Sequence, residues 1–146
     1  MNWYKKSSIS RYKKSSISRY KNKFAERKET LSNWIDVWNS IRTLTSKTPN
    51  NGIIGNINGI TMKLVDGDKV KLQHDIDFVE GGNDKAYDYM PKNEIWIDKN
   101  IHSHDWQFIC LHEFVEKVIM ERDKLSYNEA HKLADEVEKE ARLLHS

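Results

Sequence analysis

The chain has 146 residues, of which 38% are hydrophobic and 32% charged, and its formal net charge is +2. That length suits one domain with a core of its own, and no run approaches the roughly 20 apolar residues that a membrane-spanning helix needs. The basic N-terminus is not followed by an apolar segment, so neither a secretory signal nor a membrane partner is expected. With one cysteine, Cys110, the chain cannot form an internal disulfide, which indicates a cytoplasmic protein with a buried structural thiol.

The chain opens with a basic arm. Residues 1–28 carry ten Lys and Arg against one acid, a charge of +9, while the remainder carries −7. An octad, YKKSSISR, occupies Tyr4–Arg11, returns at Tyr12–Arg19, and decays at Tyr20–Arg27. We expect residues 1–25 to be flexible and to bind nucleic acid or an acidic protein surface, or else to act as a solubilising tail. The candidate contacts are Lys5, Lys6, Arg11, Lys13, Lys14 and Arg19.

Residues 26–146 are predicted to form a single α+β domain. It comprises an N-terminal helix over 26–47, a small antiparallel or mixed sheet over 53–98, and a C-terminal helical hairpin over 103–146. The helix is indicated by one apolar stripe at helical spacing. Its members are Leu31, Trp34, Ile35, Trp38, Ile41 and Leu44.

The sheet region reads as four or five short strands, mostly antiparallel. Asp66-Gly67 lies between two alternating runs, which predicts a hairpin. Gly81-Gly82 is typical of a tight turn between strands around Phe78 and Tyr87. Another turn, over residues 91–93, precedes a strand at Glu94–Asp98.

Two helices follow. The first is expected over 103–122 with Ser103 as its N-cap, and the second starts at Ser126, where Ser126 and Glu129 form a capping box. About three residues join them, so they must pack as an antiparallel hairpin. The apolar stripe of the second helix consists of Tyr127, Ala130, Ala134, Val137, Ala141 and Leu144.

The first of these helices carries the segment HEFVE. His112 and Glu116 are four residues apart and project from one face, so both can reach one ion; an imidazole nitrogen and a carboxylate oxygen bind zinc at about 2.0–2.2 Å. His131, on the partner helix, is the candidate third ligand. In His-Glu-x-x-His metalloproteases the Glu after the first His is the general base, a role that Glu113 can keep. The alternative interpretation is an amphipathic helix with solvated acids.

Two further acids follow His131 on the same helix. Asp135 lies one turn from His131, and Glu138 lies two turns along the same face. Because a ligand histidine usually donates its second N–H to a carboxylate, Asp135 or Glu138 is expected to orient His131.

The pattern YDYMP…EIWID…LHE…E…M…SY.EAH..A.EVE resembles the zincin-like metallopeptidases, and most closely small phage and prophage proteins among them. The resemblance covers about residues 75–142. It implies His112, Glu116 and His131 as zinc ligands and Glu113 as the base. It also implies that an edge strand, DIDFVE or EIWID, aligns a peptide substrate. Glu116 departs from the usual second His, and a carboxylate also suits manganese or iron.

Three functions compete. The first is a zinc-dependent hydrolase, a peptidase of the host cytoplasm, with Tyr127 or Tyr89 near the oxyanion. The second is a non-catalytic phage structural or accessory protein, in the cytoplasm or virion, whose arm binds nucleic acid or an acidic partner. The third, ranked last, is a di-metal carboxylate site that uses His112, Glu113, Glu116, His131, Asp135 and Glu138. His102 and His104 are expected to be solvent-exposed beside the motif helix.

Overall fold

The computed structural model describes residues 27–145, and the basic arm predicted for residues 1–25, with its six candidate contact residues, lies outside them. Within the described range the chain forms four α-helices, two short 3-10 helices and four strands. In chain order these are a 3-10 helix Leu31–Trp34, α3 Ile35–Thr45, β1 Ile53–Ile57, β2 Ile60–Val65, α4 Gly67–Gln73, β3 Gly81–Asn83, β4 Glu94–Asp98, a 3-10 helix Ser103–Asp105, α5 Trp106–Asp123 and α6 Tyr127–His145.

The four strands form one mixed sheet in the order β1-β2-β4-β3. β1 pairs with β2, and β3 with β4, in antiparallel fashion, whereas β2 and β4 run parallel. This confirms the predicted α+β class with a small mixed sheet. β4 lies inside the sheet and residues 75–80 contain no strand, so neither segment proposed as a substrate-aligning edge is an edge strand. The edges are β1 and β3.

The hairpin predicted at Asp66-Gly67 is wrong. The Asp66 carboxylate accepts hydrogen bonds from the backbone N–H groups of Asp68 and Lys69, and so caps α4. Gly67 is needed here because a β-carbon would lie 2.2 Å from a carboxylate oxygen of Asp98. An Asp-Gly pair is found at helix N-termini as well as in hairpin turns. Here the hydrogen bonds from two backbone N–H groups to the Asp66 carboxylate favour the helix.

The hairpin lies earlier, at Asn58-Gly59 between β1 and β2. Both residues have positive φ, 51° and 86°, as a two-residue turn of the type I′ class requires. Asn-Gly is the strongest short hairpin signal, and the sequence interpretation overlooked it.

The turn predicted at Gly81-Gly82 is also wrong, because these residues open strand β3. A β-carbon on Gly81 would lie 2.7 Å from Ile109, and one on Gly82 would lie 2.5 Å from the Tyr87 ring. The glycines therefore serve close packing, with β3 pressed against α5 on one side and against Tyr87 on the other. The turn before Glu94–Asp98 is confirmed.

The helical predictions hold with shifted ends. The N-terminal helix begins at Leu31 instead of residue 26, and Ile35 is 44% exposed, outside the buried stripe. Ser103 is not a cap, since the His102 side chain accepts from the His104 N–H at the start of that 3-10 helix.

The Ser126 capping box is confirmed: the Ser126 backbone N–H donates to the Glu129 side chain, and the Ser126 Oγ accepts from the Glu129 backbone N–H. Leu144 is 64% exposed and leaves the stripe of α6.

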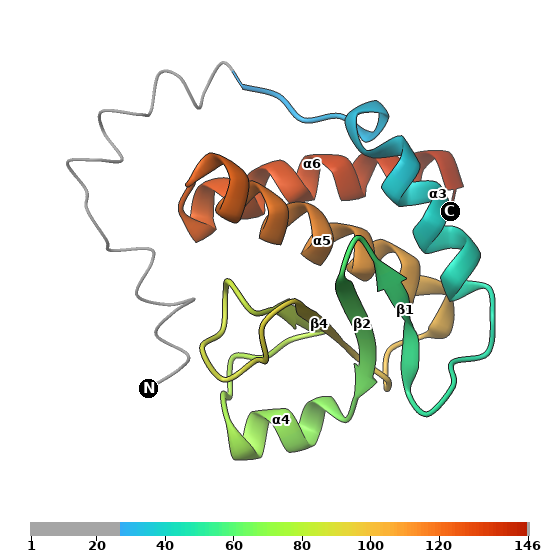
Figure 1. The fold of residues 1–146 in the computed structure, drawn as a ribbon, viewed down its shortest axis with the longest axis vertical. Helices are drawn as coiled ribbons and strands as arrows, with labels where there is room; N and C mark the ends of the chain where they lie inside the picture. The colour runs from blue at the N-terminus through green and yellow to red at the C-terminus, as the bar shows by residue number, and fades with distance from the viewer. Residues whose placement is uncertain (1–26, 146) are drawn as a thin grey trace.

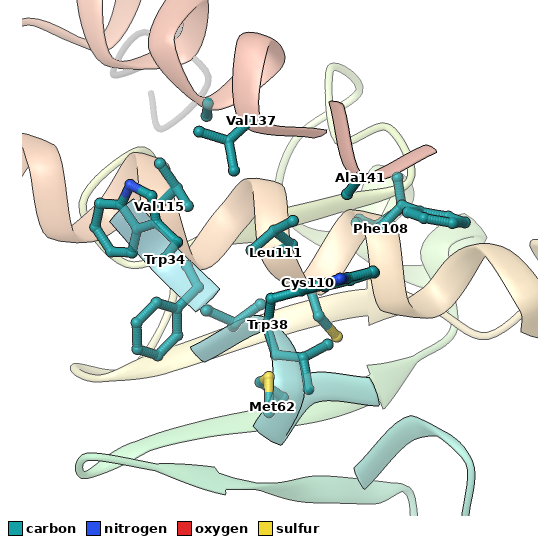
Figure 2. Close-up of a cluster of buried hydrophobic side chains, with 14 of the residues drawn as sticks. Trp34, Trp38, Met62, Phe108, Cys110, Leu111, Val115, Val137 and Ala141 are labelled. Carbon is teal, nitrogen blue, oxygen red and sulfur yellow. The ribbon is translucent and has the colours of Figure 1, made fainter. Parts of the chain in front are cut away.

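Helix α5 lies between α6 and the sheet, with α3 crossing beside it (Figure 1). Every residue from Phe108 to Lys117 is buried, so α5 has no solvent face along this stretch. Figure 2 shows how α3, β2, α5 and α6 contribute side chains to one core, among them Trp38, Met62, Leu111 and Val137. None of the described helices combines the length and apolar character needed to cross a membrane.

Cys110 belongs to this core and is fully buried, as predicted. Burial raises the pKa of its thiol well above the usual range, with the nearby charge of Glu113 acting in the same direction. The side chain therefore behaves as a small apolar group.

Candidate metal centre

The buried stretch of α5 contains four polar side chains, His112, Glu113, Glu116 and Lys117, each no more than 5% exposed. A helix covered on all sides cannot solvate them, so each must find a partner inside the protein. These four side chains divide into two groups with different partners. Lys117 is paired with Asp84 at 2.6 Å, and the other three residues face a group of side chains from β3 and α6.

Three donor atoms converge between α5 and α6. Nε2 of His112 lies 3.1 Å from Oε2 of Glu116 and 3.1 Å from Nδ1 of His131, and that Nδ1 lies 2.9 Å from the same Glu116 oxygen. Donor atoms about 2.1 Å from a tetrahedral zinc ion are about 3.4 Å apart, so this triangle is only slightly smaller than a zinc site requires. The predicted residues His112, Glu116 and His131 thus come together with chemistry that fits zinc.

The helical hairpin explains the convergence. The i, i+4 spacing places His112 and Glu116 on one face of α5, and that face is turned toward α6. Only residues 124–126 connect the two helices, and Lys124 ends α5 with a left-handed backbone, φ 58°. This short return brings His131, one turn into α6, opposite His112.

The acids of α6 lie on the other side of the His112 ring. Oε1 of Glu138 is 2.9 Å from Nδ1 of His112. Glu138 was predicted to orient His131, but it orients His112 instead. Asp135 lies between the two imidazoles, 3.4 Å from His112 and 3.6 Å from His131. Such carboxylate contacts fix the ring orientation of a ligand histidine.

These acids also bear on the di-metal interpretation. His112, Asp135 and Glu138 form a second group of close donor atoms, but it shares His112 with the first group. The other oxygen of Glu138 accepts from Arg142 Nε at 2.8 Å. A cation already occupies that side of Glu138, so the second group is better suited to orienting His112 than to binding a second ion.

Asn83 is the site residue that the sequence interpretation missed. It lies at the end of β3, is fully buried, and donates from Nδ2 to Oε1 of Glu113 and Oε1 of Glu116, both at 3.0 Å. The available signal was the run Gly-Gly-Asn-Asp, in which two glycines allow close approach to another element and two polar residues follow. Interpreting the glycines as a turn concealed this signal.

A cleft of about 310 Å³ opens beside the three donor atoms. It is lined by Val79, Glu80, Ile109, His112, Glu113, His131, Asp135 and Glu138. Glu113, the predicted base, therefore faces the same space as two of the predicted ligands. A larger hollow, of about 800 Å³, lies elsewhere, between α3 and the start of α5, and contains no candidate ligand.

The two tyrosines suggested for an oxyanion lie in different places. The Tyr127 hydroxyl is 3.2 Å from Nδ1 of His131, next to the donor triangle. Tyr89 instead stacks on the His74 ring, 4.6 Å between centroids, and packs against the second core cluster, to which Tyr127 also belongs. His102 and His104 are exposed, as predicted, and His104 borders the larger hollow.

The electrostatics of the site centre on His112. Burial alone would lower the pKa of its ring, but contacts with Glu116 and Glu138 and the charge of Glu113 outweigh burial and raise it to about 11. Burial alone would raise the pKa of Glu138, and the contacts with His112 and Arg142 outweigh it and lower that pKa. The metal-free site therefore compensates its carboxylates by holding a proton on His112.

This proton predicts pH-dependent metal binding. Its contribution to the stability of the metal-free protein is complete below pH 6.5 and is lost as pH rises through about 11. A metal ligand must be deprotonated, so zinc has to displace the His112 proton, and zinc affinity should rise about tenfold per pH unit between pH 6 and 8. Competition titration against a chelator measures this slope, and calorimetry in buffers of different ionisation enthalpy measures the proton released. An affinity independent of pH would contradict the prediction.

Comparison of the chain with families of known proteins, with curated proteins and with solved structures finds no match.

Proposed function

We propose that the protein is a zinc-dependent hydrolase, most suitably a peptidase, with a zincin-like domain. The observation that supports this is the convergence of His112 Nε2, Glu116 Oε2 and His131 Nδ1 within 2.9–3.1 Å of one another, beside a cleft that Glu113 also lines. Two histidines and one glutamate are an accepted set for catalytic zinc. Manganese or iron is the second choice, because the set includes a carboxylate.

The charge of the site supports a divalent cation. Four acids line the cleft, Glu80, Glu113, Asp135 and Glu138, and no lysine or arginine does so among the residues the structure describes. Glu116, fully buried, adds another carboxylate at the donor triangle. Two of these carboxylates, those of Glu113 and Glu116, are buried, and buried carboxylates are costly unless cations or protons offset them. A divalent ion at the triangle would offset them and replace the proton on His112.

A zinc ion bound here would supply a Lewis acid and lower the pKa of water toward about 7. The chain supplies the remaining chemistry. We assign to the Glu113 carboxylate the proton of the attacking water; the water oxygen bonds to the scissile carbonyl carbon, the C–N bond breaks, and the proton passes to the leaving amine. To the Tyr127 hydroxyl, which lies 3.2 Å from Nδ1 of His131, we assign a hydrogen bond to the developing oxyanion. The substrate would be a peptide or protein of the reducing cytoplasm.

Metal content tests the proposal. The protein is purified without a chelator or His-tag, offered zinc, freed of excess, and measured by elemental analysis beside His112→Ala and Glu116→Ala. About one zinc per chain is expected in the wild type and almost none in either variant. His104→Ala is the matched control, because this exposed histidine lies outside the site and should leave zinc content unchanged. A wild type without stoichiometric zinc would refute the proposal.

If the protein binds zinc but hydrolyses no substrate, the alternative function is supported. A screen of peptides and unfolded proteins that finds no cleavage by the zinc-loaded wild type would favour the alternative, a non-catalytic phage structural or accessory protein. In that case the metal would stabilise the helical hairpin, and the basic arm would make the contact with nucleic acid or an acidic partner.

A further inference from the structure

The orientation of Asn83 is fixed on every side. Its backbone is paired with Ile95 in the sheet, and its Oδ1 accepts from the backbone N–H groups of Lys85, at 2.9 Å, and Ala86, at 3.1 Å. Because the oxygen of the amide is used in this turn, the nitrogen must be the atom that faces α5. Both of its hydrogens are then directed at carboxylates of α5.

These two hydrogen bonds connect the proposed base with a proposed ligand. Nδ2 of Asn83 donates to Oε1 of Glu113 and to Oε1 of Glu116, each at 3.0 Å. The close approach of β3 to α5 at Gly81 makes this reach possible, since a β-carbon there would lie 2.7 Å from Ile109. One neutral side chain therefore sets the positions of two acids on neighbouring turns of α5.

The consequence for Glu116 concerns the number of oxygens it offers. Its Oε1 is bound by Asn83, and its Oε2 lies in the donor triangle. Glu116 is thereby held as a ligand of one oxygen. Zinc in proteins takes few donors in a tetrahedral set, whereas harder ions such as manganese prefer six or more donors, mostly oxygens. A carboxylate free to offer both oxygens would suit the harder ions better.

Asn83 carries no charge, and this also affects whether a metal ion can bind. A cation at this position would compensate Glu113 and Glu116 and compete with a metal ion. The buried cation of α5, Lys117, is instead paired with Asp84, the residue after Asn83, at 2.6 Å. The two residues at the end of β3 therefore have different roles. Asp84 compensates the charge of Lys117, and Asn83 orients Glu113 and Glu116 without neutralising them.

We propose that Asn83 is a specificity-determining residue of the metal centre, which restricts Glu116 to one oxygen, so that the site selects zinc over manganese, and which holds Glu113 toward the cleft. This inference rests on the proposed zinc site and adds to it the residue that decides which ion is bound. Asn83 acts through Glu116 and Glu113 and is a positioning residue.

The test compares two metals in Asn83→Ser and wild type. Serine can keep the turn hydrogen bonds that asparagine makes, but its hydroxyl is too short to hold two carboxylates. Zinc and Mn²⁺ affinities are measured by chelator competition. Loss of such an outer contact should weaken zinc binding about 10–100-fold. Mn²⁺ binding should hold or improve, so the ratio of the two affinities should fall at least about tenfold, within that same range.

A spectroscopic readout separates positioning from general destabilisation. Co²⁺ bound to the wild type should give the intense visible bands of a four-coordinate ion, and Asn83→Ser should weaken them as the coordination number rises. A purely structural role would weaken both metals equally and leave the spectrum unchanged, which would overturn the inference. Asn83→Ala, measured in the same way, serves if the serine variant does not fold. A wild type that binds no zinc would refute the proposed function, whereas an unchanged ratio in a zinc-binding protein would refute only the role of Asn83.

Discussion

Glu113→Gln is expected to lower kcat/KM for peptide hydrolysis by about 10²–10⁴-fold, the usual contribution of a general base. Zinc content should remain that of the wild type, because Glu113 is not one of the three converging donors. Glutamine matches the shape of glutamate, and its carbonyl oxygen can still accept the hydrogen bond from Asn83, so the fold of the site should be kept. The measurement is the rate of cleavage of a peptide found by screening, with elemental analysis of the same sample.

Glu136→Gln is the matched control for this substitution. Glu136 is an exposed acid of α6, one residue from Asp135, and it does not line the cleft. Removing its charge should leave the rate nearly unchanged. A Glu113→Gln variant that cleaves as fast as the wild type would remove Glu113 from the role of base.

Asp84→Asn is expected to lower the free energy of unfolding by about 3–5 kcal/mol, because it leaves the charge of Lys117 buried without its main partner. Lys117 is fully buried, and its Nζ lies 2.6 Å from Asp84 but 3.5 Å from the half-exposed Glu121. The ion pair also joins the end of β3 to α5, the two elements that hold Asn83 and two of the three candidate ligands, His112 and Glu116. Urea denaturation followed by circular dichroism gives the free energy.

The comparison variant for this pair is Lys117→Met. Methionine fills most of the volume of the lysine stem without its charge, and the Asp84 side chain, 6% exposed, keeps slightly more contact with water than the fully buried Lys117. This variant should therefore lose less stability than Asp84→Asn, and the double variant should recover most of the loss. Equal losses in both single variants would show that packing, and not charge, dominates at this position.

The helical half of the molecule could be predicted from local sequence. The capping box of Ser126 and Glu129, and the stripe that begins at Tyr127, are set by residues within a few turns of one another. The same locality predicted that His112 and Glu116 share a face. Helix geometry fixes such relations without knowledge of the rest of the chain.

The sheet could not be predicted equally well, because its strands are defined by distant partners. β2 pairs in parallel with β4, about 30 residues later, and the three-residue β3 exists only because it pairs with β4. Gly81 and Gly82 have a low intrinsic preference for strands, yet contact with Ile109 and Tyr87 makes glycine the residue that fits. Tertiary packing thus outweighed local preference where β3 meets α5.

The candidate site divides along the same line. Its three donors come from the two helices, and their meeting follows from helical periodicity and a short connection. Asn83 comes from β3, and its place opposite Glu113 depends on how the sheet packs against α5. The pairing of Glu138 with His112, and not with His131, likewise depends on the rotation of α6 against α5, which spacing along one helix does not specify.

Cys110, a buried residue of α5, can report how often the packing around this helix opens. The sole cysteine of the sequence is fully buried, and burial keeps its thiol protonated. A thiol reagent can modify it only while the packing around α5 is transiently broken, so the alkylation rate counts these openings. The thiol lies on the same helix as His112 and Glu116, two and six residues away. If an ion binds at those residues as proposed and holds the helix in place, the alkylation rate of Cys110 should fall when the ion is added, and no added label is needed to measure this.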